Sequence, residues 1–226
     1  MGIPTLRELA DELREVVTGR AGIADGVISP LVFVAVNAFA GVRPAAIAGL
    51  GTALAIVVVR LIRRRPLRFA VSGLLGTGLA IALASRTGRA ETYFLPGIIS
   101  GALTTAVIAI SLARKRPAAA YASWITRGWP IEWYWHPSVR PAYLAATWLW
   151  LWFFSIRTGV QAWLYAEEAA TTLGVVRVAT GWPGILALLA ATYAIGRSRL
   201  ESLNGPSVVE FEQGVEPPWT GQERGF

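Results

Sequence analysis

The sequence predicts an all-α, polytopic integral membrane protein with six transmembrane helices. Hydrophobic residues make up 54% of the 226 residues, whereas charged residues make up only 15%. Between Asp25 and Arg197 the chain contains several long apolar runs. Runs of about 17 to 25 residues match the roughly 30 Å hydrocarbon core of a bilayer. A soluble domain spreads its charges more evenly, so lipid is the expected solvent of most of this chain.

The first segment, residues 1–20, is expected to form an amphipathic cytoplasmic helix. Thr5 and Glu8 have the spacing of a capping box, and leucines and valines fall on one face of a helix from Pro4 to Val17. The other face is acidic, which favours packing on the protein's own cytoplasmic side over lying on an anionic bilayer surface. The sequence leaves both arrangements open. No removable signal peptide is expected, because no basic region leads directly into an apolar run.

Six apolar segments within a membrane domain at 21–200 are expected to cross the bilayer. These spans are 25–41, 44–62, 67–85, 93–113, 141–163 and 181–197. The apolar segment 117–127 is too short to cross, so it is expected at the interface or as a re-entrant piece. A polar cytoplasmic tail at 201–226 follows the last span. It contains Pro and Gly residues and few apolar positions at helical spacing, so no separate core is expected there.

The distribution of Lys and Arg predicts that both termini lie in the cytoplasm. With the amino terminus inside, 16 of the 21 Lys and Arg residues fall on inner segments. The five on the outer side are Arg43, Arg86, Arg89, Arg157 and Arg177. This asymmetry is what the positive-inside rule requires, so we expect a multi-pass protein of the bacterial cytoplasmic membrane.

The net charge of +7 is explained by orientation in the membrane and by anionic lipid headgroups at the cytoplasmic Arg clusters. Nucleic-acid binding would need a basic face on a folded soluble domain, and no nucleic acid is expected as a partner.

An internal repeat predicts that the six spans form three helical hairpins around a central axis. The even spans begin alike, and the third and fifth spans begin with Arg-Pro and finish with Arg-Thr-Gly. The starts of the even spans are Arg43-Pro44-Ala45-Ala46-Ile47, Leu95-Pro96-Gly97-Ile98 and Trp182-Pro183-Gly184-Ile185. Pro44, Pro96 and Pro183 are therefore candidate helix breaks. The alternative is chance recurrence, since bilayers favour Pro at helix starts and Arg at cytoplasmic ends.

Two polar residues inside predicted spans are candidates for a buried ligand site. Arg157 lies about 16 residues, or roughly 24 Å, into the helix that starts at Pro141. Its guanidinium either reaches the outer headgroups or belongs to a buried ion pair or anion site. Asn37 on the first span either bridges two helices or contacts a ligand. The sequence leaves both alternatives open.

Small residues predict close helix contacts on the third and fourth spans. Gly73 and Gly76 lie on the third span, and Gly97 and Gly101 on the fourth span have GxxxG spacing. Tryptophans at mid-depth on the fifth span suit lipid contact or subunit packing. A homo-oligomer and other membrane proteins are therefore candidate partners, besides the lipid bilayer itself.

The sequence offers no candidate catalytic residue, cofactor site or metal site. It has no Cys and a single His, His136, which falls in a loop. No acidic residue falls in the interior of a predicted span. Paired carboxylates or a histidine base are what acid–base chemistry needs, so we expect a protein that is not an enzyme.

Three stretches carry a family resemblance that covers about residues 20–200. They are Arg60–Arg68 (RLIRRRPLR), Arg86–Ile98 (RTGRAETYFLPGI) and Leu173–Ile185 (LGVVRVATGWPGI). They resemble an uncharacterised actinobacterial multi-pass membrane family that carries only a domain-of-unknown-function label. More distantly, the hairpin layout and the last two spans are similar to the intracellular septation protein A family. That second resemblance implies a link to cell-envelope synthesis or division, without catalytic residues.

Two functions are consistent with these features. The first is a non-enzymatic, division- or envelope-associated membrane protein of the bacterial cell envelope that acts through protein partners. The second is a small-solute or ion transporter or channel that uses the centre of the hairpin repeat, favoured by Arg157 and by the proline-started even helices. A polar, hydrated centre would favour transport, whereas a dry centre packed with Gly and Ala would argue against it.

Overall fold

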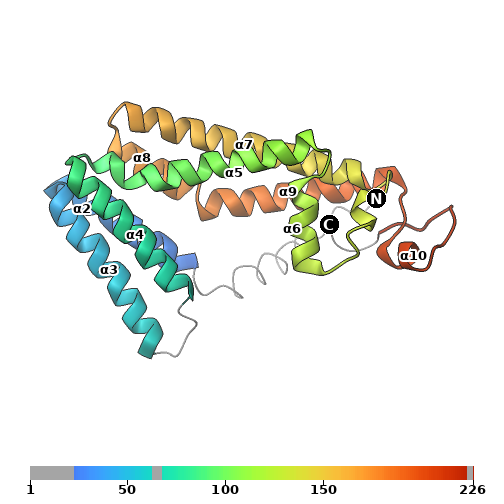
Figure 1. Ribbon diagram of the computed structural model, residues 1–226, viewed down its shortest axis with the longest axis horizontal. Coiled ribbons are helices and arrows are strands. Elements are labelled where there is room, and N and C mark those ends of the chain that lie inside the picture. The colour runs from blue at the N-terminus through green and yellow to red at the C-terminus, as the bar shows by residue number, and fades with distance from the viewer. Residues whose placement is uncertain (1–22, 63–67, 223–225) are drawn as a thin grey trace. The chain divides into compact units, whose positions relative to one another are not determined.

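In the computed structural model, backbone is described for residues 23–62, 68–222 and 226, and every regular element within these ranges is helical (Figure 1). Six long helices correspond to the six predicted spans. They are α2 Ile23–Ala40, α3 Val42–Ile62, α4 Arg68–Thr87, α5 Leu95–Ala113, α7 Arg140–Ala166 and α9 Trp182–Leu203. The shorter elements are η1 Ala90–Phe94, α6 Ala118–Arg127, η2 Trp133–Trp135, α8 Ala170–Ala179 and α10 Val208–Glu212. The amphipathic helix predicted at 1–20 lies outside the described residues.

Three helical segments of the described chain are long and apolar enough to cross a membrane. They are Val42–Ile62, Ala90–Ala113 and Ala170–Leu203, and shorter apolar helices occupy Leu31–Ala40 and Leu74–Thr87. Large apolar side chains lie exposed along these helices, as with Phe39 at 93% exposure and Ile47 at 75%. Such surfaces are expected in contact with lipid tails, because there the apolar side chains are not exposed to water. These features indicate a helical membrane protein.

Helix α7 is absent from this group because of its composition rather than its length. Its 27 residues include Arg140 and Arg157 and many Trp and Tyr residues. At 1.5 Å per residue such a helix is about 40 Å long, which is enough to cross a bilayer. The indole and phenol groups are amphipathic, so they lower its apolar character without making it a typical soluble helix.

The chain forms two compact units, which we call unit 1 and unit 2. Unit 1 contains residues 1–101 and 157–185, and unit 2 contains residues 102–156 and 186–226. Helices α5, α7 and α9 each contribute residues to both units.

In unit 1 the element η1 anchors an aromatic core. Consecutive helices α2, α3 and α4 pack together, and α2 also packs against α8. The rings of Phe33 and Tyr93 stack with 4.0 Å between centroids, and Phe94 meets Tyr93 edge-on at 5.1 Å. Gly174 of α8 lies against Val34 of α2, where any added side chain would collide. The short loop from α4 to α5 is therefore held by aromatic packing rather than left at the surface.

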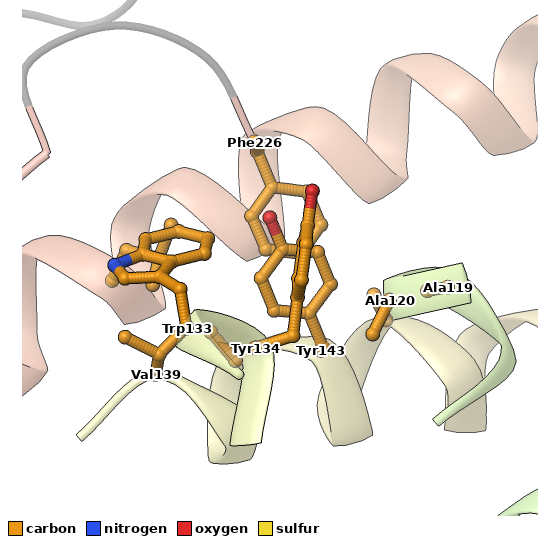
Figure 2. Close-up of a cluster of buried hydrophobic side chains, with 10 residues drawn as sticks. Ala119, Ala120, Trp133, Tyr134, Val139, Tyr143 and Phe226 are labelled. Atoms are coloured by element: carbon orange, nitrogen blue, oxygen red, sulfur yellow. The ribbon is translucent and has the colours of Figure 1, made fainter. Parts of the chain in front are cut away.

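In unit 2 a second aromatic cluster joins α6, η2, the start of α7, the end of α9 and the tail. Figure 2 shows the Phe226, Tyr134 and Tyr143 rings gathered together, with Trp133 close by. Phe226 stacks on Tyr143 with 4.3 Å between centroids. The Trp133 indole donates to the Pro206 carbonyl at 2.9 Å. The tail thus contributes to a core in unit 2, although it was expected to build none of its own.

Candidate functional site

Two arginines of unit 1 form the centre of the candidate site. Arg157 lies on α7 and Arg177 on α8, and both side chains are half-buried. The two guanidinium groups are close enough to repel each other electrostatically. Like charges in a poorly solvated region raise the free energy of the protein unless an anion neutralises them.

Two glycines of α5 lie against Arg177 and against Thr158, which follows Arg157 in the chain. The Arg177 guanidinium occupies the space that a side chain at Gly97 would need. It also lies 5.9 Å from the centroid of the Phe94 ring. One turn along α5, the Thr158 hydroxyl oxygen is 2.7 Å from the position that a Cβ of Gly101 would take. The absence of side chains at Gly97 and Gly101 therefore lets polar groups of α7 and α8 approach the α5 backbone.

Gln161, which lies on α7 as Arg157 does, supplies a further hydrogen-bond donor. It follows Arg157 by four residues, so the two side chains are neighbours on the surface of α7. Gln161 is only 2% exposed, and its Nε2 atom has no hydrogen-bond partner within the described part of the chain. A buried donor without an acceptor costs roughly 1 to 3 kcal/mol, which a ligand oxygen would offset.

Two carboxylates of unit 1, those of Glu91 and Glu168, form ion pairs with Arg89. Arg89 pairs with Glu168 at 2.9 Å and with the buried carboxylate of Glu91. The hydrogen bond to Glu91 raises the pKa of Arg89. Among the residues whose side chains the structure describes, no carboxylate lies within ion-pair distance of Arg157 or Arg177. Glu91 and Glu168 therefore do not neutralise Arg157 or Arg177.

The donors of this arrangement suit an anion. A guanidinium offers planar, paired N–H donors that match the oxygens of a carboxylate, phosphate or sulfate. No group of three or more His, Asp and Glu residues suited to a metal ion occurs in the described part of the chain. The chemistry available is charge neutralisation and hydrogen bonding to a ligand.

The other polar candidate from the sequence, Asn37, lies on α2 three residues after Val34, which contacts α8. Its backbone carbonyl accepts a hydrogen bond from Gly41 at 3.3 Å. Nothing in the described structure joins the Asn37 side chain to Arg157 by a hydrogen bond. The ligand role predicted for Asn37 stays a prediction.

The three predicted helix-break prolines lie in first turns of helices. Pro44 is the third residue of α3, and Pro96 and Pro183 are the second residues of α5 and α9. Proline fits these positions because the first turn has no intrahelical acceptor for its missing N–H. A role of these prolines in ligand binding stays a prediction.

The glycines of α4 differ from those of α5 in their surroundings. Gly76 has open space where a side chain would point, and Gly73 lies on the same helix. The close contacts described above concern Gly97 and Gly101. Helix packing at the α4 glycines stays a prediction.

Arg177 and Gln161 are the site residues that the sequence reasoning missed. Arg177 was assigned to an outer loop, although it stands alone in the apolar run Val175–Ala179. Gln161 was overlooked as an amide inside the fifth predicted span. A lone charge in an apolar run, and an amide one helical turn from an arginine in a predicted span, are the signals that identify them.

Comparison with protein families assigns the chain to a family without giving it an activity. The model of the family described as "Protein of unknown function (DUF3159)" matches residues 17–202, which is most of the chain. No curated protein and no solved structure matches the chain. The chain therefore belongs to the DUF3159 family.

Proposed function

We propose that this DUF3159 protein binds a small oxyanion in the membrane and transports or conducts it. The proposal rests on Arg157 and Arg177, two half-buried arginines of unit 1 that repel each other electrostatically and have no ion-pair partner among the described side chains, and on the Arg177 guanidinium, which lies against the backbone of Gly97. An unneutralised arginine in a membrane costs at least about 2.5 kcal/mol, so its retention is best explained by a ligand that neutralises it.

The donors favour an oxyanion over a halide. Two guanidinium groups and the Gln161 amide supply several N–H donors in different directions. Such a set suits the separate oxygens of phosphate, sulfate or a carboxylate, whereas a spherical ion uses fewer of them. One anion would be bound by the side chains of Arg157, Arg177 and Gln161 together.

The proposed topology has six spans arranged as three hairpins, with both termini in the cytoplasm. Support comes from the six long helices, from the repeated span motifs and from the 16-to-5 distribution of Lys and Arg. On this topology the arginine pair lies toward the outer half of the bilayer, and a transported anion would enter the site from the outer side.

A second candidate is a division- or envelope-associated function of a bacterial membrane protein that acts through partners. It is favoured by exposed aromatic side chains on the part of α7 that belongs to unit 2. Trp148 and Trp152, one helical turn apart, are 50% and 63% exposed. A subunit or another membrane protein would cover such side chains, and the distant similarity to the septation protein A family points the same way.

Anion flux in proteoliposomes tests the first function. The full chain is reconstituted, and uptake of radiolabelled phosphate, sulfate and acetate is measured for the wild type, Arg157→Gln and Arg177→Gln. We expect saturable uptake of at least one anion, reduced by about tenfold or more in each variant, because removing one partner of a charged contact costs about 2 kcal/mol or more. Arg86→Gln, which removes an exposed arginine at the end of α4, is the matched control and should behave as wild type.

Binding is measured separately in detergent, as the rise in unfolding temperature that each anion produces. Anion-dependent stabilisation that both site variants lose, without flux in the wild type, would replace transport with a binding role and favour the partner-based function. Equal flux in wild type, Arg157→Gln and Arg177→Gln would overturn the site.

A further inference from the structure

The turn between α5 and α6 is a strongly basic segment at the end of a candidate membrane span. Residues 113–128 include Arg114, Lys115, Arg116 and Arg127 and no Asp or Glu. The candidate span that contains α5 ends at Ala113. The positive charges therefore begin directly where an apolar helix stops.

Local hydrogen bonds give this turn a defined geometry. The Arg116 and Lys115 N–H groups donate to the carbonyls of Ser111 and Leu112, both at 2.9 Å. The Ser111 hydroxyl accepts from the N–H of Ala118 at 3.2 Å, which ties the start of α6 to the end of α5. Figure 1 shows that α6 runs across the direction of α5. If α5 crosses the bilayer, α6 lies along its surface.

One face of helix α6 packs against other residues of unit 2, and its other face is exposed. Ala119, Ala120 and Ser123 are buried, and the Ala119 N–H donates to the Thr147 hydroxyl at 3.2 Å. On the open side, Trp124 is 43% exposed and Ile125 is 75% exposed. A tryptophan beside an exposed isoleucine is typical of a helix in the interfacial region of a membrane.

The four cations have two different environments. The Arg116 guanidinium lies 5.3 Å from the Trp135 ring centroid, and that of Arg127 lies 5.1 Å from the Trp129 centroid. These contacts hold two charges on aromatic faces. Arg114 and Lys115 are exposed, and no described carboxylate pairs with either of them. They are therefore available to a ligand outside the protein.

We propose that α6 and the 114–116 turn form a binding surface for anionic phospholipid headgroups. Trp124 and Ile125 enter the interfacial region, and Arg114 and Lys115 contact lipid phosphates. Lipid is favoured over an acidic protein partner because apolar and basic groups lie side by side where a membrane-spanning helix ends, which is the depth of the headgroups. This surface belongs to unit 2, and it does not depend on the anion site in unit 1.

Native mass spectrometry of the full chain in detergent tests the proposal. Dioleoyl-phosphatidylglycerol or dioleoyl-phosphatidylcholine is added, and retained lipid is counted for the wild type and for Arg114→Gln/Lys115→Gln. Each basic residue near an anionic surface contributes roughly fivefold in affinity, so the double variant should bind phosphatidylglycerol about 10- to 30-fold more weakly. Retention of phosphatidylcholine should change little.

The matched control is Arg43→Gln/Arg86→Gln, which removes two exposed arginines from unit 1 and should retain phosphatidylglycerol as the wild type does. Equal retention by the wild type and the Arg114→Gln/Lys115→Gln variant would overturn the proposal. Displacement of the lipid by inorganic phosphate at equal concentration would also overturn it, because the site would then recognise a free anion.

A second measurement keeps the proposal testable if the double variant does not fold. In nanodiscs, brominated phosphatidylglycerol should quench the fluorescence of the wild type more than that of Trp124→Phe. The same quenching in both proteins would show that Trp124 does not reach the lipid, contrary to the proposal.

Discussion

Trp150 of α7 donates its indole N–H to the hydroxyl of Thr192 on α9, with 2.8 Å between Nε1 and Oγ1. Thr192 is 7% exposed, so its hydroxyl has little access to other partners. Thr192→Val keeps the shape of the side chain and leaves the indole N–H without its acceptor. We expect a loss of about 1 to 2 kcal/mol in the free energy of unfolding, measured by denaturant titration in detergent.

Thr192→Ser is the control for this contact because serine retains the hydroxyl. It should cost less than the valine variant, although it loses a methyl group worth about 0.8 kcal/mol. A valine variant as stable as wild type would show that the hydrogen bond contributes nothing.

The same change, Gly to Ala, should affect stability differently at two helical positions. At Gly196 of α9 an added methyl group would collide with the Phe226 ring, whereas at Gly76 of α4 it would enter open space. Gly196→Ala should therefore destabilise the protein by about 1 to 3 kcal/mol through overpacking. Gly76→Ala should be neutral or stabilise it by up to about 1 kcal/mol, because alanine favours the helix.

Unfolding midpoints of the two alanine variants, measured together, check this contrast. To confirm the cause, Gly196→Ala is combined with Phe226→Ala, which removes the obstructing ring. The double variant should lose less stability than the sum of the two single changes. Additive losses would argue against the Gly196–Phe226 contact.

Glu210 should keep the segment 207–221 closed in moderate acid. Its carboxylate accepts hydrogen bonds from the backbone N–H groups of Thr220 and Ser207, at 2.7 and 2.8 Å, and from both hydroxyls. These bonds, chiefly that of the Thr220 N–H, lower the pKa of Glu210 to about 2. The stability that the ionised Glu210 carboxylate gives to this segment is fully present above the ordinary pKa of 4.5. It is lost as the pH falls toward 2.

The Thr220 amide chemical shift in protein labelled with 15N-threonine measures this transition. It should stay in its native position through pH 4 and change as the pH approaches 2. Glu210→Gln should remove the acid step and shift the amide at every pH. A midpoint near 4.5 in the wild type would contradict the hydrogen-bonded carboxylate.

The helices were predictable from local information. Each predicted span coincides within a few residues with a long helix, as 44–62 does with α3 and 93–113 with α5. The length of an apolar run and the arginines at its ends are local properties of the sequence. In a bilayer, every backbone group of a spanning segment must also be hydrogen-bonded within its own helix. The separate helix α8 was not predicted, because its ten residues are too few for a span and were assigned to a loop.

The candidate site was predictable only in pieces. Arg157 stood out as a charge inside an apolar segment, and Gly97 and Gly101 stood out by their spacing. Nothing in these patterns joins them, because Gly97 and Arg177 are eighty residues apart in the chain and come together only through packing. The same holds for Phe226, whose ring stacks on Tyr143 although the tail looked polar and without a core.

By itself the sequence determined that this is a helical chain for a lipid environment, because composition and periodicity act within single helices. The tertiary structure decided which polar groups meet. It placed the Arg177 guanidinium against Gly97 and the Thr158 hydroxyl against Gly101, and it paired the carboxylates of Glu91 and Glu168 with Arg89. Apart from the Arg89–Glu91 pair, these are relationships between distant segments, and their free energy depends on burial and distance, which exist only once the helices have packed.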